Sequence, residues 1–391
     1  MLQAPGVSFT NQDSSIERLI SPDSLEARKN IILISVESLS GDYMKRFGNT
    51  RNITPYLDSL ISKSLFFDKF YASGTRTVRG LEALALAIPP TPGQSIVRRP
   101  GNEEMFTMGS VLKSKGYDVK YIYGGNSFFD NMGYFFSHND YEVIDQRDIP
   151  KERIHHKTIW GVADEDAFSI ALDICDNSYN SGKLFFNHIM TVSNHRPYTY
   201  PDGRIDIPSS MQSWEGAVKY TDYCINSFLQ QAQSKPWFNN TIFVIVSDHC
   251  SSSAGKTDLP VTRYHIPCLI YSPSFIKPRI EEKLTSQIDL APTLLGLMNM
   301  KYSSRFLGYD ILRTTEGNER VFISTYQNMG YLKSDTLTIL SPQKKVATYK
   351  VNMATGDALK ITSNPQLTDE AVAWYQSADF FFHSGKYKKV P

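Results

Sequence analysis

An unbroken apolar run over residues 31–34, extended by Val36, constrains the fold of this chain more than any other stretch. β-branched and aliphatic residues in such a run predict a strand that is buried on both faces, as in a parallel sheet. The run ends in Glu37, and open α/β sheets bind ligands just outside the carboxyl ends of their strands. Glu37 is therefore either a polar residue that merely ends a strand or part of a site.

A second buried strand is predicted over residues 241–247, and it leads directly into Asp248 and His249. A carboxylate followed by an imidazole offers an oxygen and a nitrogen ligand, which suits a divalent metal ion. Adjacent Asp and His residues also occur in ordinary surface turns. Two buried strands that both end in ligand-capable residues leave the metal site and the turn as open alternatives.

Between these strands, residues 72–88 predict a loop followed by a helix, since apolar residues recur at helical spacing from Thr77 onward. Thr77 falls at the start of that helix, where threonine serves well as an N-cap. It could instead be a hydroxyl nucleophile. Its anionic substrate would then meet backbone N–H groups of the helix start together with Arg76 and Arg79.

Glu37, Thr77 and the Asp248–His249 pair, in this order, resemble the sulfatase-like enzymes of the alkaline phosphatase superfamily, of the lipoteichoic acid synthase and phosphoglycerol transferase type. The resemblance covers roughly residues 28–312. It implies an α/β fold in which helices flank a mostly parallel sheet. Three further phrases support it: TIWGVADEDAF at 158–168, TVSNHRPY at 191–198 and SQIDLAPTLLG at 286–296.

The resemblance also implies roles for individual residues. Thr77 would be the catalytic nucleophile, and His195, at the end of a predicted strand over 184–189, would bind substrate. One divalent cation is expected, with Mn²⁺ favoured over Mg²⁺ or Zn²⁺ because three oxygens and one nitrogen would hold it. The four expected ligands are Glu37, Thr77, Asp248 and His249.

One loop departs from the family pattern. In lipoteichoic acid synthases the loop that corresponds to residues 124–131 carries a His and an Arg that hold the substrate phosphate, and neither is present here. We therefore expect Arg76 or Arg79 to contact the phosphate, with Asn126 as the substrate-binding candidate of the loop itself. Gln287 stands where relatives that bind two zinc ions have a His, which favours a single metal.

The implied activity is the transfer of glycerophosphate from a phosphatidylglycerol-like anionic phospholipid to a glycan or polymer hydroxyl, through a covalent intermediate on threonine. Phosphoethanolamine transferases, phosphodiesterases and sulfatases of the same superfamily are alternatives. Sulfatases need a Cys or Ser that is converted to formylglycine, and this residue stands in a C/S-x-P-x-R motif. Residues 74–80, GTRTVRG, contain neither the Cys nor the Pro of that motif. A non-catalytic module that binds lipid or glycan in the cell envelope is the remaining alternative.

Charge and hydropathy bear on partners and location. A net charge of +1 gives no reason to expect nucleic acid binding. No apolar run reaches the ~18 residues that a membrane span needs. The family usually carries membrane helices before an extracytoplasmic catalytic domain, so the resemblance implies a monomeric ectodomain in the periplasm or on the outer face of the cytoplasmic membrane.

The expected organisation is a linker over 1–27, a catalytic domain over 28–312 and a small C-terminal α+β subdomain over 313–391. In the last, short antiparallel strands over 321–327, 330–340 and 344–352 precede a helix over 369–380. A further helix is predicted over 54–68, opened by Thr54. Asp222 is expected to be solvated or capping, and His265 to line the pocket or to pack structurally. The four cysteines leave disulfide pairing open.

Overall fold

The computed structural model describes residues 8–9, 16–251 and 259–389. Its centre is an eight-stranded sheet in which β9, β3, β8, β6 and β7 run parallel, and β10 runs antiparallel to both neighbours. The mostly parallel sheet expected from the sequence is confirmed. In spatial order the strands are β11 (Arg279–Glu281), β4 (Leu65–Phe67), β10 (Cys268–Tyr271), β9 (Thr241–Ser247), β3 (Asn30–Val36), β8 (Phe185–Met190), β6 (Asp118–Tyr123) and β7 (Glu142–Ile144).

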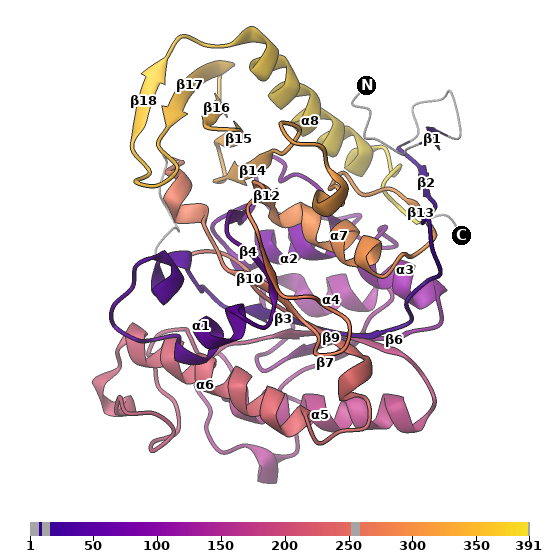
Figure 1. Cartoon of the computed structure of the whole chain (residues 1–391), viewed down its shortest axis with the longest axis vertical. Helices are drawn as coiled ribbons and strands as arrows, with labels where there is room; N and C mark the ends of the chain where they lie inside the picture. Colours follow the sequence, from indigo (N-terminus) through magenta and orange to yellow (C-terminus); the bar gives the residue numbers. More distant parts are fainter. Residues whose placement is uncertain (1–7, 10–15, 252–258, 390–391) are drawn as a thin grey trace.

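Helices cover both faces of this sheet (Figure 1). One face packs against α1 (Pro55–Ile61), α5 (Asp164–Asn180) and α6 (Trp214–Ala232). The other packs against α2 (Thr77–Leu86), α3 (Met108–Ser114), α4 (Met132–Ser137) and α7 (Leu290–Leu297). Successive side chains of a strand point to opposite faces. In β3, Ile31 and Leu33 therefore join one core while Ile32 and Ile34 join the other, which explains the unbroken apolar run.

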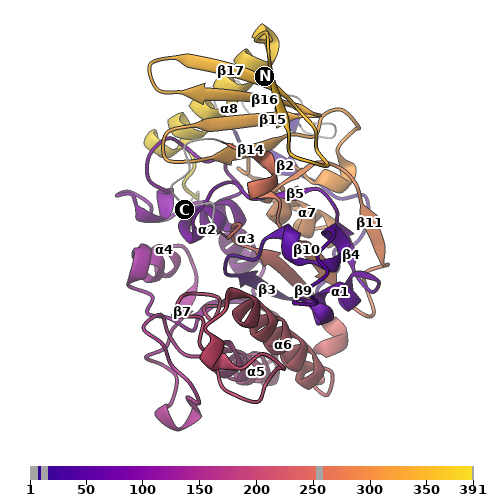
Figure 2. The ribbon, with the colours of Figure 1, turned by 90° about the vertical axis from the view of Figure 1, so that its left-hand side faces the viewer.

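The C-terminal part forms a separate antiparallel sheet with a long helix, and both views place it beyond the layer of α2 and α7 (Figures 1 and 2). Trp374 and Tyr375 of the helix pack against Phe322 of the sheet. A buried ion pair of 2.8 Å joins Arg320 to Asp289 next to α7. The elements are β14 (Val321–Ser324), β15 (Met329–Lys333), β16 (Thr336–Ser341), β17 (Lys345–Val351), β18 (Ala358–Ile361) and α8 (Pro365–His383).

Three segments differ from the sequence expectations. The strand expected over 330–340 is a hairpin of two strands, β15 and β16, with Ser334 and Asp335 in the turn between them. The helix predicted over 54–68 ends at Ile61, and residues 65–67 form β4 instead. These three consecutive apolar side chains are buried in the cores on both faces of the sheet, as a strand allows. The expected N-terminal linker is partly built into the fold, since β2 (Arg18–Ile20) pairs with β1 (Ser8–Phe9) and with β13 (Tyr302–Ser304).

A short parallel pair, β5 (Phe70–Tyr71) with β12 (Thr285–Ser286), leads the chain from the main sheet toward α2. None of the helices in the described part of the chain combines the length and the apolar composition that a membrane span needs.

Candidate active site

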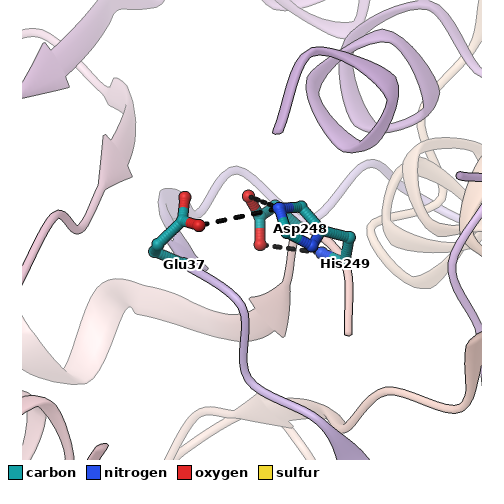
Figure 3. A group of neighbouring side chains, drawn as sticks. All are labelled: Glu37, Asp248 and His249. Carbon is teal, nitrogen blue, oxygen red and sulfur yellow. Dashed lines mark hydrogen bonds and ion pairs between the residues drawn. The ribbon is translucent and has the colours of Figure 1, made fainter. Parts of the chain in front are cut away.

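Two neighbouring parallel strands bring the predicted metal ligands together. β3 and β9 pair in register with Val36 opposite Ser247, so Glu37 and Asp248 leave the sheet side by side. His249 follows directly. Figure 3 shows the imidazole of His249 facing both carboxylates, and one ligand atom from each of the three buried residues lies within 4.8 Å of the others.

The hydrogen bonds around this cluster leave its ligand atoms available. Nδ1–H of His249 donates to the carbonyl of Cys250 at 2.8 Å, so the Nε2 lone pair faces Glu37 and Asp248 at 3.6 and 3.5 Å. Oδ1 of Asp248 accepts from the N–H groups of Ser38 and His249 at 2.8 and 2.7 Å. Its Oδ2 is buried and has no hydrogen-bond partner among the described residues.

The charges of the buried carboxylates also favour a bound metal ion. Burial raises the pKa of Asp248, and the negative charge of Glu37 raises it further. Burial alone would also raise the pKa of Glu37, but His195 and His249 lower it below its ordinary value. Two buried carboxylates this close together repel one another. A divalent cation would offset that repulsion and use the unsatisfied Oδ2, so the residues fit a metal site.

Thr77 lies beside the cluster at the start of α2. It is the first helical residue, and its hydroxyl donates to Oε2 of Glu37 at 3.1 Å. The N-cap position belongs to Arg76, so the N-cap interpretation of Thr77 is wrong. A Cβ on Gly80 would lie 2.3 Å from the carbonyl oxygen of Asp248, and the absence of that carbon lets α2 begin this close to the cluster. A hydroxyl at a helix start beside a metal site is suited to attack an anionic substrate.

His195 approaches the same carboxylate from the loop that follows β8. Its Nε2 lies 3.4 Å from Oε2 of Glu37, and its ring stacks on the indole of Trp160 with centroids 4.2 Å apart. Burial lowers the pKa of His195, but the charge and hydrogen bond of Glu37 outweigh it and raise the pKa. Nδ2 of Asn194 donates to the carbonyl of Glu37 at 2.9 Å, which fixes this loop beside β3.

These groups open into one cavity of about 980 Å³. Its lining contains Glu37, Arg76, Thr77, His195 and His249, and it also contains residues that the sequence analysis did not single out. Trp160, Arg196 and Tyr198 stand inside phrases quoted for the resemblance, which could have indicated them. Further lining residues come from loops and helix starts elsewhere in the chain and carry no local signal, among them Asp42, Tyr43, Asn49, Arg51, Trp214 and Arg263.

The structure does not bring Arg79 to the cavity. Two residues along a helix turn about 200° around its axis, so Arg79 points away from the side on which Thr77 lies. Its guanidinium is buried, pairs with Glu82 at 2.9 Å and donates to the carbonyls of Thr91 and Gly93 at 2.6 and 2.5 Å. Arg79 therefore holds the loop after α2, and the exposed Arg76 is left as the phosphate-binding candidate of this segment.

Two other candidates also lie elsewhere. Asn126 is exposed, accepts from the N–H of Phe128 at 3.1 Å and is not among the residues that line the cavity. His265 donates from Nε2 to the carbonyl of Asp68 at 2.9 Å and packs against Phe47. Of its two interpretations, the structural one is confirmed.

The position where a second metal would need ligands is used for packing. Nε2 of Gln287 donates to the carbonyls of Ser247 and Asp248 at 3.0 and 2.9 Å, and its Oε1 accepts from the N–H of Ser73 at 3.0 Å. Gln287 thus joins the strand end that carries Asp248 to the loop before α2. All four cysteines lie in the described part of the chain, are buried and form no disulfide.

Comparisons of the sequence with known proteins agree with this geometry. The sulfatase family model matches residues 29–300. Phosphoglycerol transferase I of Xanthomonas campestris pv. campestris is 24% identical over 306 residues, 72% of this chain and 42% of that protein. A lipoteichoic acid synthase-like protein of Bacillus subtilis is 21% identical over 341 residues, 78% of this chain and 53% of that protein. The chain spans about half the length of the curated relatives it matches.

Solved structures share the whole architecture. A protein in the alkaline phosphatase superfamily from Vibrio parahaemolyticus superposes with a TM-score of 0.92 at 30% identity, covering 97% of this chain and 93% of that one. The lipoteichoic acid synthase LtaP from Listeria monocytogenes gives a TM-score of 0.76 at 19% identity, covering 97% and 96%. Both similarities extend over the C-terminal sheet as well as the main one.

Proposed function

Because this chain belongs to the sulfatase family of the alkaline phosphatase superfamily, we propose that it transfers a glycerophosphate group from a phosphatidylglycerol-like lipid to a hydroxyl of a glycan or polymer. Relatives named phosphoglycerol transferase and lipoteichoic acid synthase support the choice of this group. The observation that carries the proposal is the hydroxyl of Thr77, bonded to Glu37 at a helix start beside three converging metal ligands.

Glu37, Thr77, Asp248 and His249 would hold the cation of this enzyme, and their oxygen-rich donor set supports Mn²⁺, with Mg²⁺ and Zn²⁺ as alternatives. When bound, the cation would lower the pKa of the Thr77 hydroxyl and stabilise negative charge on a phosphoryl oxygen. The tautomer of His249 is already set for this role by its bond to the carbonyl of Cys250.

In the first half-reaction Oγ of Thr77 attacks the phosphorus of the donor. The Oγ–P bond forms and the bond from phosphorus to the diacylglycerol oxygen breaks, with its electron pair going to that oxygen. Glu37 accepts the hydrogen bond of the Thr77 hydroxyl and so orients its oxygen, and the proton that the hydroxyl loses passes to solvent. His195, whose pKa is raised, supplies a proton to the leaving oxygen, so diacylglycerol departs neutral. First-turn N–H groups of α2 and the guanidinium of Arg76 bind the phosphoryl oxygens.

In the second half-reaction a hydroxyl of the acceptor attacks the same phosphorus. The new O–P bond forms, the Oγ–P bond breaks, and glycerophosphate passes to the acceptor. The proton of the acceptor hydroxyl goes to His195, and Thr77 takes a proton from solvent as it leaves phosphorus, which restores the starting state. We further propose that this takes place outside the cytoplasmic membrane, in a monomeric ectodomain, as the resemblance implies.

The proposal is tested by measuring which phospholipid head group the enzyme removes. The purified chain would be incubated with Mn²⁺ and vesicles of phosphatidylglycerol or phosphatidylethanolamine, and diacylglycerol release measured. We expect release from phosphatidylglycerol by the wild type, partial release by Thr77→Ser, which keeps a hydroxyl, and none by Thr77→Ala. Release from phosphatidylethanolamine alone would favour a phosphoethanolamine transferase, and release from neither lipid would favour a binding module.

A further inference from the structure

A small hairpin beside the cavity exposes an apolar side chain at its tip. Lys157 and Val162 form an antiparallel bridge, and the N–H of Thr158 donates to the carbonyl of Gly161 at 2.8 Å, which places Ile159 and Trp160 in the turn. Ile159 is 89% exposed. Turns usually carry Gly, Asn, Asp or Ser at these positions. Turn geometry therefore gives no reason for an isoleucine here.

A second loop adds two aromatic side chains to the same edge. Phe128 and Phe129 follow β6 and are 76% and 44% exposed. The loops are joined because Gly125 forms an antiparallel bridge with Gly161. The ring of Phe129 also meets Trp160 edge-on with centroids 5.6 Å apart. We name this continuous surface the apolar rim: Phe128, Phe129, Ile159 and Trp160.

The apolar rim connects directly to the reacting groups. Phe129 and Trp160 line the cavity, whereas Phe128 and Ile159 are outside its lining. Trp160 stacks on His195, which in turn lies 3.4 Å from Glu37. One side of the rim is thus a wall of the cavity, and its outer side chains meet the surroundings of the protein.

We propose that the apolar rim inserts into the surface of a phospholipid bilayer and so brings the head group of a lipid to Thr77. The proposal rests on the proposed function, in which the donor is a bilayer lipid. Exposed Ile and Phe side chains gathered on loop tips, such as Ile159, Phe128 and Phe129, enter the interface between head groups and acyl chains. A deformable lipid surface can accept such projecting side chains without a matching pocket, which favours lipid over a protein partner.

Positive charges next to the apolar rim fit anionic head groups. Lys157 is exposed at the base of the hairpin, where it forms the bridge with Val162. The guanidinium of Arg147 lies 4.6 Å from the ring centre of Phe128, and its side chain is 54% exposed although it also pairs with the buried Asp145 at 2.8 Å. Cations close to inserted aromatic rings lie at the level of lipid phosphates, and the negative phosphates attract them.

The experiment is sedimentation with vesicles of phosphatidylglycerol and phosphatidylcholine. The variant is Phe128→Ser combined with Ile159→Ser, since both side chains are exposed and lie outside the cavity. The matched control is Leu359→Ser on β18, where a leucine is 71% exposed far along the chain. We expect the double variant to bind vesicles about tenfold more weakly, because two large apolar side chains no longer leave water. The control should bind like the wild type.

A second measurement separates this proposal from the proposed function. With a short-chain phosphatidylglycerol dispersed below its micelle concentration, the wild type and the double variant should release diglyceride at equal rates, while the variant should be slower on vesicles. If the wild type cleaves neither donor, the transferase proposal fails, and vesicle binding still decides the role of the rim. Equal vesicle binding by wild type and double variant, or rim-dependent dimers in ultracentrifugation, would overturn the membrane proposal.

Discussion

The hydroxyl of Thr77 donates to Oε2 of Glu37 at 3.1 Å, although 40 residues separate the two in sequence. Glu37 is fixed by the end of a central strand and Thr77 by the start of a helix that packs against Asp248 through Gly80. The candidate nucleophile and the candidate metal ligands are therefore positioned by the most buried part of the fold. The following predictions depend on that arrangement.

Asp248→Asn should stabilise the protein without metal while abolishing its response to metal. The substitution removes one of two buried carboxylates that repel each other, and this gain should be about 1 kcal/mol. A bound cation stabilises the folded state by about 2.7 kcal/mol at a hundredfold excess over Kd. Thermal unfolding in EDTA and in Mn²⁺ measures both effects. A variant that is less stable than the wild type in EDTA, or that keeps the Mn²⁺ shift, contradicts this account.

The two arginines near Thr77 should behave in opposite ways. Arg79→Ala leaves the buried carboxylate of Glu82 without its ion pair and should lower the free energy of unfolding by about 3–5 kcal/mol. Arg76→Ala removes an exposed side chain and should change stability by less than about 0.5 kcal/mol. It should nevertheless reduce kcat/KM for the phospholipid. Urea unfolding measures the stability of the two variants, and initial rates measure their activity. If Arg79→Ala lowered kcat/KM at unchanged stability while Arg76→Ala lowered stability instead, Arg79 would be the arginine that binds substrate.

A buried histidine should make stability depend on pH. His188 in β8 is buried, its Nε2 lies 2.6 Å from the hydroxyl of Ser35, and burial lowers its pKa to about 3 from the ordinary value of 6.5. Because the folded-state pKa is depressed, the neutral ring contributes stability that is complete above pH 6.5. It is lost as the pH falls from 6.5 toward 3, with a slope approaching about 1.4 kcal/mol per pH unit.

The loss between pH 7 and pH 5 should reach about 2 kcal/mol from this group. His188→Gln keeps a polar side chain that does not titrate in this range, so its unfolding free energy should fall less over the same interval. Comparing urea unfolding of the two proteins at several pH values isolates the contribution of His188. If the unfolding free energies of wild type and variant changed with pH in parallel, His188 would not contribute to the pH dependence.

The sequence alone predicts the elements that position the site, because their signals are local. Residues 241–247 are the strand β9, and the apolar run before Glu37 is β3. Glu37, Asp248 and Thr77 each directly follow or begin a strongly patterned segment. Their meeting follows from the rule that the carboxyl ends of parallel strands share one edge of a sheet.

What the sequence does not predict depends on contacts between distant segments. Asp222 is buried in α6 and accepts from the N–H groups of Tyr56 and Leu57, so it caps α1 from another helix. Its sequence neighbourhood does not distinguish this role from solvation. Tyr43 and Trp214 reach the cavity from loops and helix starts far apart in the chain, and they stack with centroids 4.6 Å apart. Arg79 is different, since helical periodicity already places it away from Thr77.

The most direct test of the central claim is the mass of the protein itself after reaction. Wild type, Thr77→Ala and Glu37→Gln would be mixed with phosphatidylglycerol and Mn²⁺, quenched in acid and examined by intact-mass and peptide mass spectrometry. The account predicts one glycerophosphate group on Thr77 of the wild type, much less in Glu37→Gln and none in Thr77→Ala. Diacylglycerol release without any adduct, or an adduct that persists in Thr77→Ala, would contradict the assignment of Thr77 as the nucleophile.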